Sequence, residues 1–222
     1  IRRQRQMCIR DRVRARLDLA GFKHVKIFVS GGHAAKYFSA VTRTNKNVPA
    51  PHQGLTFFVV PSNTEGLEER PFKELGVRAL GMSELFFNDV RVAEEDILGT
   101  LNEGWRVLTS IWNMERLSAA AMAMGGAQGV FEQCLQYAKE RTQFGQPIGK
   151  FQAIRHMLAE MAIDIEAARM LIYSAAWKET EGIKCPMDCS MAKLCATTTF
   201  MNVASNGIQV FGGHGYIMDS PM

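Results

Sequence analysis

The spacing of apolar residues changes once along the chain, near residue 100. Before that point, short runs rich in Phe, Val and Thr alternate with clusters of Gly, Asn and Pro, a pattern typical of strands joined by turns. The runs predict strands at residues 26–30, 36–44, 54–60 and 84–92. Their connections are too short for the crossover helices that parallel strands need. We therefore expect an antiparallel, barrel-like sheet.

From Asn102 onward, apolar residues recur every three or four positions, which is the period of a helix. Residues 152–181 predict one helix, and residues 186–213 predict another that begins at a proline and ends at paired glycines. Residues 103–140 predict either one long helix or two, with the glycines of MGGAQG as the weak point. The fold class that follows is α+β, with an antiparallel β region ahead of a helical bundle.

The formal net charge of +4 comes from the first twelve residues, which carry five Arg and one Asp. The remaining 210 residues balance 21 basic against 21 acidic side chains. One frame of a sequencing-library transposase adaptor encodes the string RRQRQMCIRD, so we interpret residues 1–12 as an adaptor scar. A basic arm for nucleic acid and a transit peptide are the alternatives. We therefore assign residues 13–98 to the β region and 99–222 to the helical bundle.

Charge and hydropathy exclude two classes of partner. Without the first twelve residues there is no excess of basic side chains for nucleic acid. No apolar run is long enough to span a membrane. The cysteines after residue 12 (Cys134, Cys185, Cys189 and Cys195) lack the spacing of a zinc site, so we expect free thiols and no metal.

One carboxylate falls on an apolar helix face. At about 100° per residue, Glu115 shares an arc with Trp105, Leu108, Trp112, Ala119 and Met122. Burial on this face would raise its pKa toward the range useful for a general base. A structural pair with Arg116, or a carboxylate that reaches solvent, is the alternative.

Two further segments contain residues suited to a phosphate ligand. In YAKERTQFGQPIGKFQAI, Arg141 is a natural partner for a diphosphate and Phe144 could flank a nucleobase. The alternative is that Arg141 favours the helix dipole and that Phe144 packs in the core. In IQVFGGHGYIMD, Gly212 and Gly213 could let the backbone approach a ligand, although a helix cap explains them equally well.

Together these segments resemble the acyl-CoA dehydrogenase family. KIFVSGG, KELGVRALGMSELFFNDVRV, MERL, YAKERTQFGQPIGKFQAI and IQVFGGHGY occur in the family's order, and the resemblance covers about residues 21–222. It implies an FAD enzyme with an N-terminal helical domain, a middle β-barrel and a C-terminal four-helix domain, usually a homotetramer. FAD would lie between the last two domains, and its ADP end would reach a neighbouring subunit. Both domains of this chain would then be incomplete.

The resemblance also assigns ligand contacts to positions of this sequence. They are, for the flavin ring, Phe28, Val29 and Ser30; for the diphosphate and adenine, Arg141, Thr142, Gln143 and Phe144; for the other ADP-side contacts, Phe151, Gln152, Gln209, Gly212 and Gly213; and for the CoA portion, Asn113 and Arg116.

The reaction implied is α,β-dehydrogenation of an acyl-CoA thioester to a trans-2-enoyl-CoA. Glu115, directly before the helix arginine, matches the catalytic base of the isovaleryl-CoA and long-chain types. Most members instead place a Glu beyond the GGxGY motif, past Met222. Electron-transfer flavoprotein would be the acceptor, in the bacterial cytoplasm or the mitochondrial matrix. A nitroalkane-oxidase-like enzyme and a DNA-associated relative on the same fold are the rivals.

Overall fold

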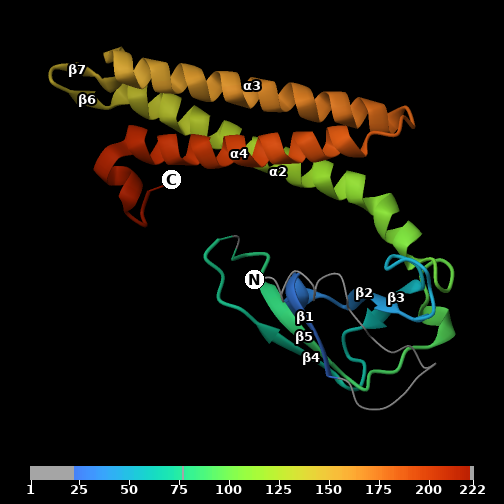
Figure 1. The fold of residues 1–222 in the computed structure, drawn as a ribbon. Coiled ribbons are helices and arrows are strands. Elements are labelled where there is room, and N and C mark those ends of the chain that lie inside the picture. The colour runs from blue at the N-terminus through green and yellow to red at the C-terminus, as the bar shows by residue number, and fades with distance from the viewer. Residues whose placement is uncertain (1–22, 77, 221–222) are drawn as a thin grey trace. The chain divides into compact units, whose positions relative to one another are not determined.

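The computed structural model describes residues 23–76 and 78–220, with side-chain burial from Lys26 onward. The assignment of residues 1–12 to an adaptor lies outside these residues. The chain divides into two compact units, one up to Ser110 and one from Ile111, and each is described by itself (Figure 1).

The first unit is an antiparallel β region. Its strands are β1 (Lys23–Ser30), β2 (Tyr37–Arg43), β3 (Leu55–Pro61), β4 (Leu67–Pro71) and β5 (Met82–Asn88), with the short 3₁₀ helices η1 (Gly32–Ala34) and η2 (Glu94–Asp96). One sheet has the order β1-β5-β4, the other pairs β2 with β3, and every pairing is antiparallel. Phe38, Phe58 and Phe87, from both sheets, share one core. The predicted antiparallel region is confirmed.

The β region differs from the prediction in two places: β4 was not predicted, and β5 is shorter than predicted. β4 has the sequence LEERP and lies at a sheet edge, where Glu68 and Arg70 are exposed. Because this sequence is mostly polar, a search for apolar runs does not detect β4. The predicted strand 84–92 stops at Asn88 because Asp89 adopts a φ of 51°, which turns the chain out of the ladder. Val90 and Val92 are nevertheless buried in the same core.

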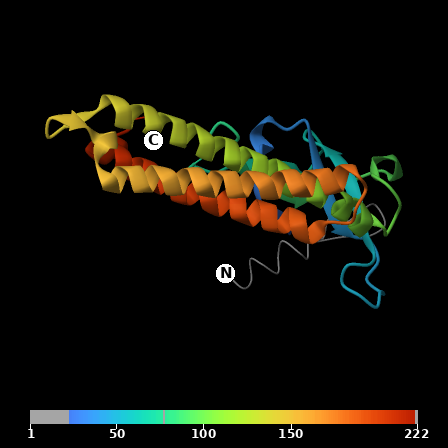
Figure 2. The same cartoon turned by 90° about the horizontal axis from the view of Figure 1, so that it is seen from above.

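The second unit consists of three helices that run alongside one another (Figures 1 and 2). They are α2 (Gly104–Glu140), which begins in the first unit, α3 (Gln152–Thr180) and α4 (Pro186–Phe211). The two later helices confirm the predicted ones to within two residues. A hairpin of β6 (Thr142–Gln143) and β7 (Gln146–Pro147), then η3 (Ile148–Lys150), connects α2 to α3, and η4 (Gly212–Tyr216) follows α4.

The glycines of MGGAQG do not interrupt α2, so residues 104–140 form one helix. Gly126 has a packing role instead. A Cβ atom at this position would lie 2.8 Å from the nearest ring atom of Phe200 on α4. The missing side chain therefore makes room for an aromatic ring, which offsets the low helix propensity of glycine.

The helices pack through small side chains. Ala120 and Ala123 of α2 are buried with alanines and cysteines of α3 and α4 in one half of the core. Ala127 lies in the other half, which the larger Met161, Ile165 and Val203 fill. Small residues allow helix backbones to approach closely, so this alanine face becomes the packing face of α2. No helix in the described part of the chain is long and apolar enough to cross a membrane.

Candidate functional site

The predicted flavin-ring residues occupy a distorted stretch of β1. The register of β1 against β5 slips between Lys26 and Val29, and Phe28 adopts a φ of 65°. Phe28 is 56% exposed and stacks on Phe72 with ring centroids 5.7 Å apart. Ser30 is also exposed, whereas Val29 packs against the β core. Positive φ costs a phenylalanine about 1–3 kcal/mol and is often found at functional sites.

The hairpin after α2 holds a second phenylalanine at positive φ. Its two central residues, Phe144 and Gly145, have φ values of 51° and 77°, the signs of a type I′ turn. Phe144 is 92% exposed and meets the ring of Phe151 edge-on, with centroids 6.1 Å apart. Thr142 and Gln143 are exposed beside it. The alternative in which Phe144 packs in the core is therefore wrong.

Arg141 directly follows α2 and precedes this hairpin. Its side chain is exposed, while its backbone N–H donates to Tyr137 O at 2.8 Å and its carbonyl accepts from Ile148 N at 2.8 Å. Within the described ranges, no carboxylate forms an ion pair with its guanidinium. The group is thus held at a fixed backbone position with its charge available to an anion.

The end of α4 presents the remaining predicted ADP-side residues. Gln209 is exposed, and Gly212 adopts φ 59° and ψ −134°, a conformation that side chains disfavour. A Cβ atom on Gly212 or Gly213 would meet nothing within 4 Å, so packing does not require a glycine at either position. Such open glycines leave backbone groups accessible to a ligand.

A stacked ring pair brings the end of α2 next to the end of α4. Tyr137 and Phe211 lie with centroids 4.2 Å apart and planes 12° apart. Arg141 follows Tyr137 by one helical turn, and Gln209 precedes Phe211 by two residues. Both ends lie at the same end of the three-helix unit (Figures 1 and 2). An exposed cation, the exposed ring of Phe144 and open glycine backbone fit the diphosphate and adenine of a dinucleotide such as FAD.

Glu115 is exposed, so the expectation that it is buried is wrong. The reason is the packing face of α2. Leu117 and Ala120 are buried with residues of α3 and α4, whereas no residue on the arc of Glu115 is fully buried and Met122 on that arc is 72% exposed. Among the described residues, Glu115 has no ion pair with Arg116. The Arg116 guanidinium instead lies 5.5 Å from the ring centroid of Trp112.

The predicted base and the predicted diphosphate contact are far apart. Glu115 and Arg141 are separated by 26 positions on α2 and the residue that follows it. At a rise of 1.5 Å per residue, this spacing is about 39 Å. One chain therefore does not bring Glu115 and Arg141 to the same place.

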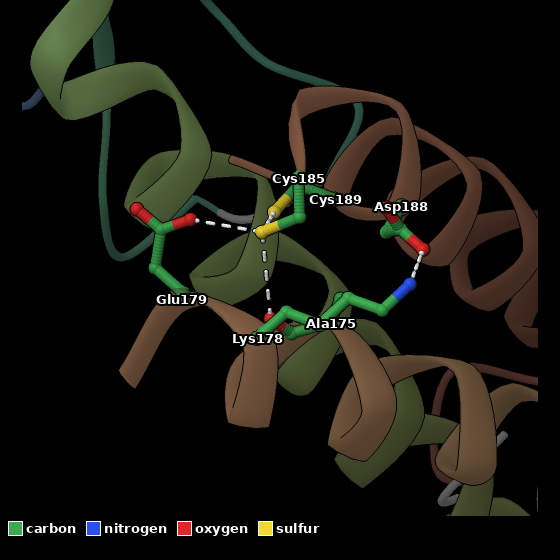
Figure 3. A network of polar contacts seen from close by, with 6 residues as sticks. All are labelled: Ala175, Lys178, Glu179, Cys185, Asp188 and Cys189. Atoms are coloured by element: carbon green, nitrogen blue, oxygen red, sulfur yellow. Dashed lines mark hydrogen bonds and ion pairs between the residues drawn. The ribbon is translucent and has the colours of Figure 1, made fainter. Parts of the chain in front are cut away.

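A polar network at the α3–α4 corner was not predicted from the sequence (Figure 3). Cys185, at the start of α4, donates to Glu179 Oε2 at 3.1 Å, and its Sγ lies 3.8 Å from Cys189 Sγ. Asn113, assigned to the CoA portion, donates from Nδ2 to the same Glu179 Oε2 at 3.1 Å. Burial, and then hydrogen bonds with Glu179 and Cys189, raise the pKa of Cys185 to about 12. Three helices meet at this carboxylate.

An ion pair also links α3 to α4 at this corner. Lys178 Nζ on α3 donates to Asp188 Oδ1 in the first turn of α4 (Figure 3). The hydrogen bond raises the pKa of Lys178 and lowers that of Asp188, which keeps both groups charged. Asp188 also lies where the helix dipole favours a negative charge.

Comparison with known proteins identifies the family. Residues 102–222 match the family profile for the acyl-CoA dehydrogenase C-terminal domain, and residues 7–90 match the profile for the middle domain of the same family. This chain therefore belongs to the acyl-CoA dehydrogenase family, as its segments predicted. The middle-domain match begins inside residues 1–12, whose assignment to an adaptor stays a prediction.

Curated and solved relatives agree on this family. The chain is 38% identical over 198 residues to cyclohexane-1-carbonyl-CoA dehydrogenase of Geobacter metallireducens, covering 89% of this chain and 51% of that protein. It resembles butyryl-CoA dehydrogenase of Megasphaera elsdenii with a TM-score of 0.84 and 34% identity, over 90% of this chain and 53% of that one. A structure described as PigA with FAD and proline has a TM-score of 0.84 and 26% identity, over 89% and 51% of the two chains. The chain thus spans about half the length of the relatives it matches.

Proposed function

We propose that this chain is part of an FAD-dependent acyl-CoA dehydrogenase that converts an acyl-CoA thioester to the trans-2-enoyl-CoA. The observation that carries the proposal is the end of the helical unit. There, Arg141 and the strained, exposed Phe144 follow α2, the open Gly212 follows α4, and the stacked rings of Tyr137 and Phe211 join the two helix ends. Arg141 and Phe144 are exposed, a Cβ atom on Gly212 would meet nothing within 4 Å, and these features suit a dinucleotide.

Several residues of this chain would bind different parts of FAD. Arg141 would bind the diphosphate, with Thr142 and Gln143 beside it, and Phe144 would lie against the adenine. Gln209 and the backbone of Gly212 and Gly213 would add contacts on the ADP side, as would Phe151 and Gln152. In the β unit, Phe28 would cover the flavin ring and Ser30 would hydrogen-bond near N5, with Val29 between them. Bound FAD supplies the acceptor for the β-hydrogen, which leaves as hydride.

We propose Glu115 as the base that removes the α-proton. A thioester makes the α-C–H weakly acidic, and a carboxylate oxygen of Glu115 would take that proton. Because Glu115 is exposed in this chain, bound substrate has to exclude water from it during the proton transfer. Arg116 and Asn113 would bind the CoA portion. A Glu beyond Met222 is the rival candidate for the base.

The spacing along α2 supports a homo-oligomer. About 39 Å separates Glu115 from Arg141, farther than one flavin dinucleotide reaches. Each flavin would therefore use the base of one chain and the Arg141 of another, in a tetramer. Electron-transfer flavoprotein is the proposed electron acceptor, and the bacterial cytoplasm or mitochondrial matrix is the proposed location.

The test is anaerobic flavin bleaching, measured in the complete reading frame that contains this chain. A panel of acyl-CoA thioesters should bleach the flavin absorbance and yield enoyl-CoA in equal amount. Free fatty acids, nitroalkanes and proline should not. Bleaching by a nitroalkane but by no thioester would replace the proposal with the nitroalkane-oxidase-like rival.

A further inference from the structure

The α3–α4 corner contains three ligand groups that do not belong to the proposed FAD contacts. Glu179 lies in the last turn of α3, Cys185 directly precedes α4, and Cys189 lies in the first turn of α4. One carboxylate oxygen and the two Sγ atoms lie within 4.8 Å of one another. Cys185 and Cys189 are 1% and 0% exposed, and Glu179 is half-buried between them and solvent.

The spacing of these atoms suits a tetrahedral metal ion. Two thiolates at about 2.3 Å from Zn²⁺ lie about 3.8 Å apart at the tetrahedral angle. The Sγ atoms of Cys185 and Cys189 lie 3.8 Å apart. A thiolate and a carboxylate oxygen on the same ion lie about 3.6 Å apart, and Cys185 Sγ to Glu179 Oε2 measures 3.1 Å. Cys189 Sγ lies within 4.8 Å of the Glu179 carboxylate oxygen, so side-chain adjustments of up to about one ångström complete the geometry.

The surroundings supply what a metal site also needs. Asn113 donates to Glu179 Oε2 and would orient this ligand from the outer shell. The Lys178 ammonium, paired with Asp188, lies at the same corner (Figure 3). The connection at residues 181–184, directly before Cys185, is exposed. Thiolate with carboxylate is a donor set that zinc accepts readily.

We propose that Glu179, Cys185 and Cys189 bind one Zn²⁺ ion, with water in the fourth position. Both thiols lose their protons on binding, so each ion that enters releases two protons, and no electron is transferred. The ion would cross-link the end of α3 to the start of α4 and, through Asn113, hold α2 to the same corner. The site is independent of the FAD contacts at the other end of the unit.

Zinc content and zinc-edge X-ray absorption test this site. The protein, reduced and then dialysed against Zn²⁺, should retain one equivalent and show two sulfur neighbours at about 2.3 Å. Cys185→Ser and Cys189→Ser should each weaken Zn²⁺ binding at least tenfold and lose one sulfur neighbour. Cys134→Ser is the matched control, because Cys134 is equally buried but lies in the other half of the helical core, and it should bind as the parent does.

Three results would overturn the site. They are binding of less than a tenth of an equivalent, a sulfur shell that survives the double cysteine substitution, and equal loss in the Cys134→Ser variant. Glu179→Gln is a second test variant in case a cysteine variant does not fold. Glutamine keeps the size of the glutamate side chain. The variant should retain both sulfur neighbours and bind Zn²⁺ about tenfold more weakly, as loss of an oriented ligand predicts.

Discussion

The two ends of the helical unit use polar residues in opposite ways. At the α3–α4 corner, Cys185 and Cys189 are buried, and Glu179 and Asp188 are bonded to partners on other helices or turns. At the other end, Arg141 and Gln209 are exposed and the turn at Phe144 is strained. Satisfied polar groups hold a fold together, whereas exposed ones on a strained backbone indicate a ligand. Loss of the first group should therefore change stability or metal binding, and loss of the second should change cofactor affinity.

The largest effect is expected for Arg141→Ala. Removal of a charge-assisted contact to a diphosphate should weaken FAD binding about 10–100-fold. Thermal stability without FAD should not change, because the side chain is exposed. FAD titration and thermal unfolding measure the two effects. Lys139→Ala removes an exposed cation two residues earlier and is the control. Equal losses of FAD affinity in both variants would assign the effect to overall charge.

The strained turn gives the next prediction. Asparagine tolerates positive φ, and Asn-Gly is a preferred type I′ pair, so Phe144→Asn should stabilise the protein without FAD by about 1 kcal/mol. The same change removes the ring proposed to face the adenine and should weaken FAD binding about tenfold. Denaturant unfolding and FAD titration measure the two quantities. A variant with weaker binding and lower stability would contradict the view that Phe144 is kept for its ligand.

The helical unit shows which features could be predicted from the sequence. The period of three to four residues placed α3 and α4 to within two residues, because each helix buries one regular face. Arg141 and Phe144 were singled out from a motif local to one turn, and their roles in binding stay predictions. Glu115 was misplaced because its arc is apolar, yet the helices pack through the alanine face, and only helix–helix contact decides between the two.

The corner network could not be predicted by the same means. This network joins Glu179, Cys185 and Asn113 from three helices. Asn113 lies 66 residues before Glu179 in the sequence. No spacing rule within one segment links such residues. β4 was missed for a different reason, since its charged sequence is that of an exposed edge strand rather than of a core strand.

The smallest effect concerns the ion pair at the corner. Because the pKa of Asp188 is lowered, its contribution is present above about pH 4 and is lost as the pH falls through the folded value. Because the pKa of Lys178 is raised, its contribution is present below about pH 10 and is lost as the pH rises further. Asp188→Asn should therefore lower Tm at pH 7 slightly, and the difference should fade below about pH 4.

The control for this prediction is Glu166→Gln, which removes a more exposed ion pair within α3. It should change Tm very little at any pH, since exposed pairs stabilise weakly. A loss of Tm in Asp188→Asn that stays constant with pH would show that the ion pair is not the cause.

The most direct test of the central claim is substrate-driven flavin bleaching in Glu115→Gln, compared with Glu132→Gln. Both residues are exposed glutamates on α2, so the substitutions are matched. In the complete reading frame, both variants should bind FAD. An acyl-CoA thioester should bleach the flavin in Glu132→Gln at the parent rate and leave it oxidised in Glu115→Gln. Near-normal bleaching in Glu115→Gln would remove this residue as the base and assign the proton transfer to a carboxylate beyond Met222.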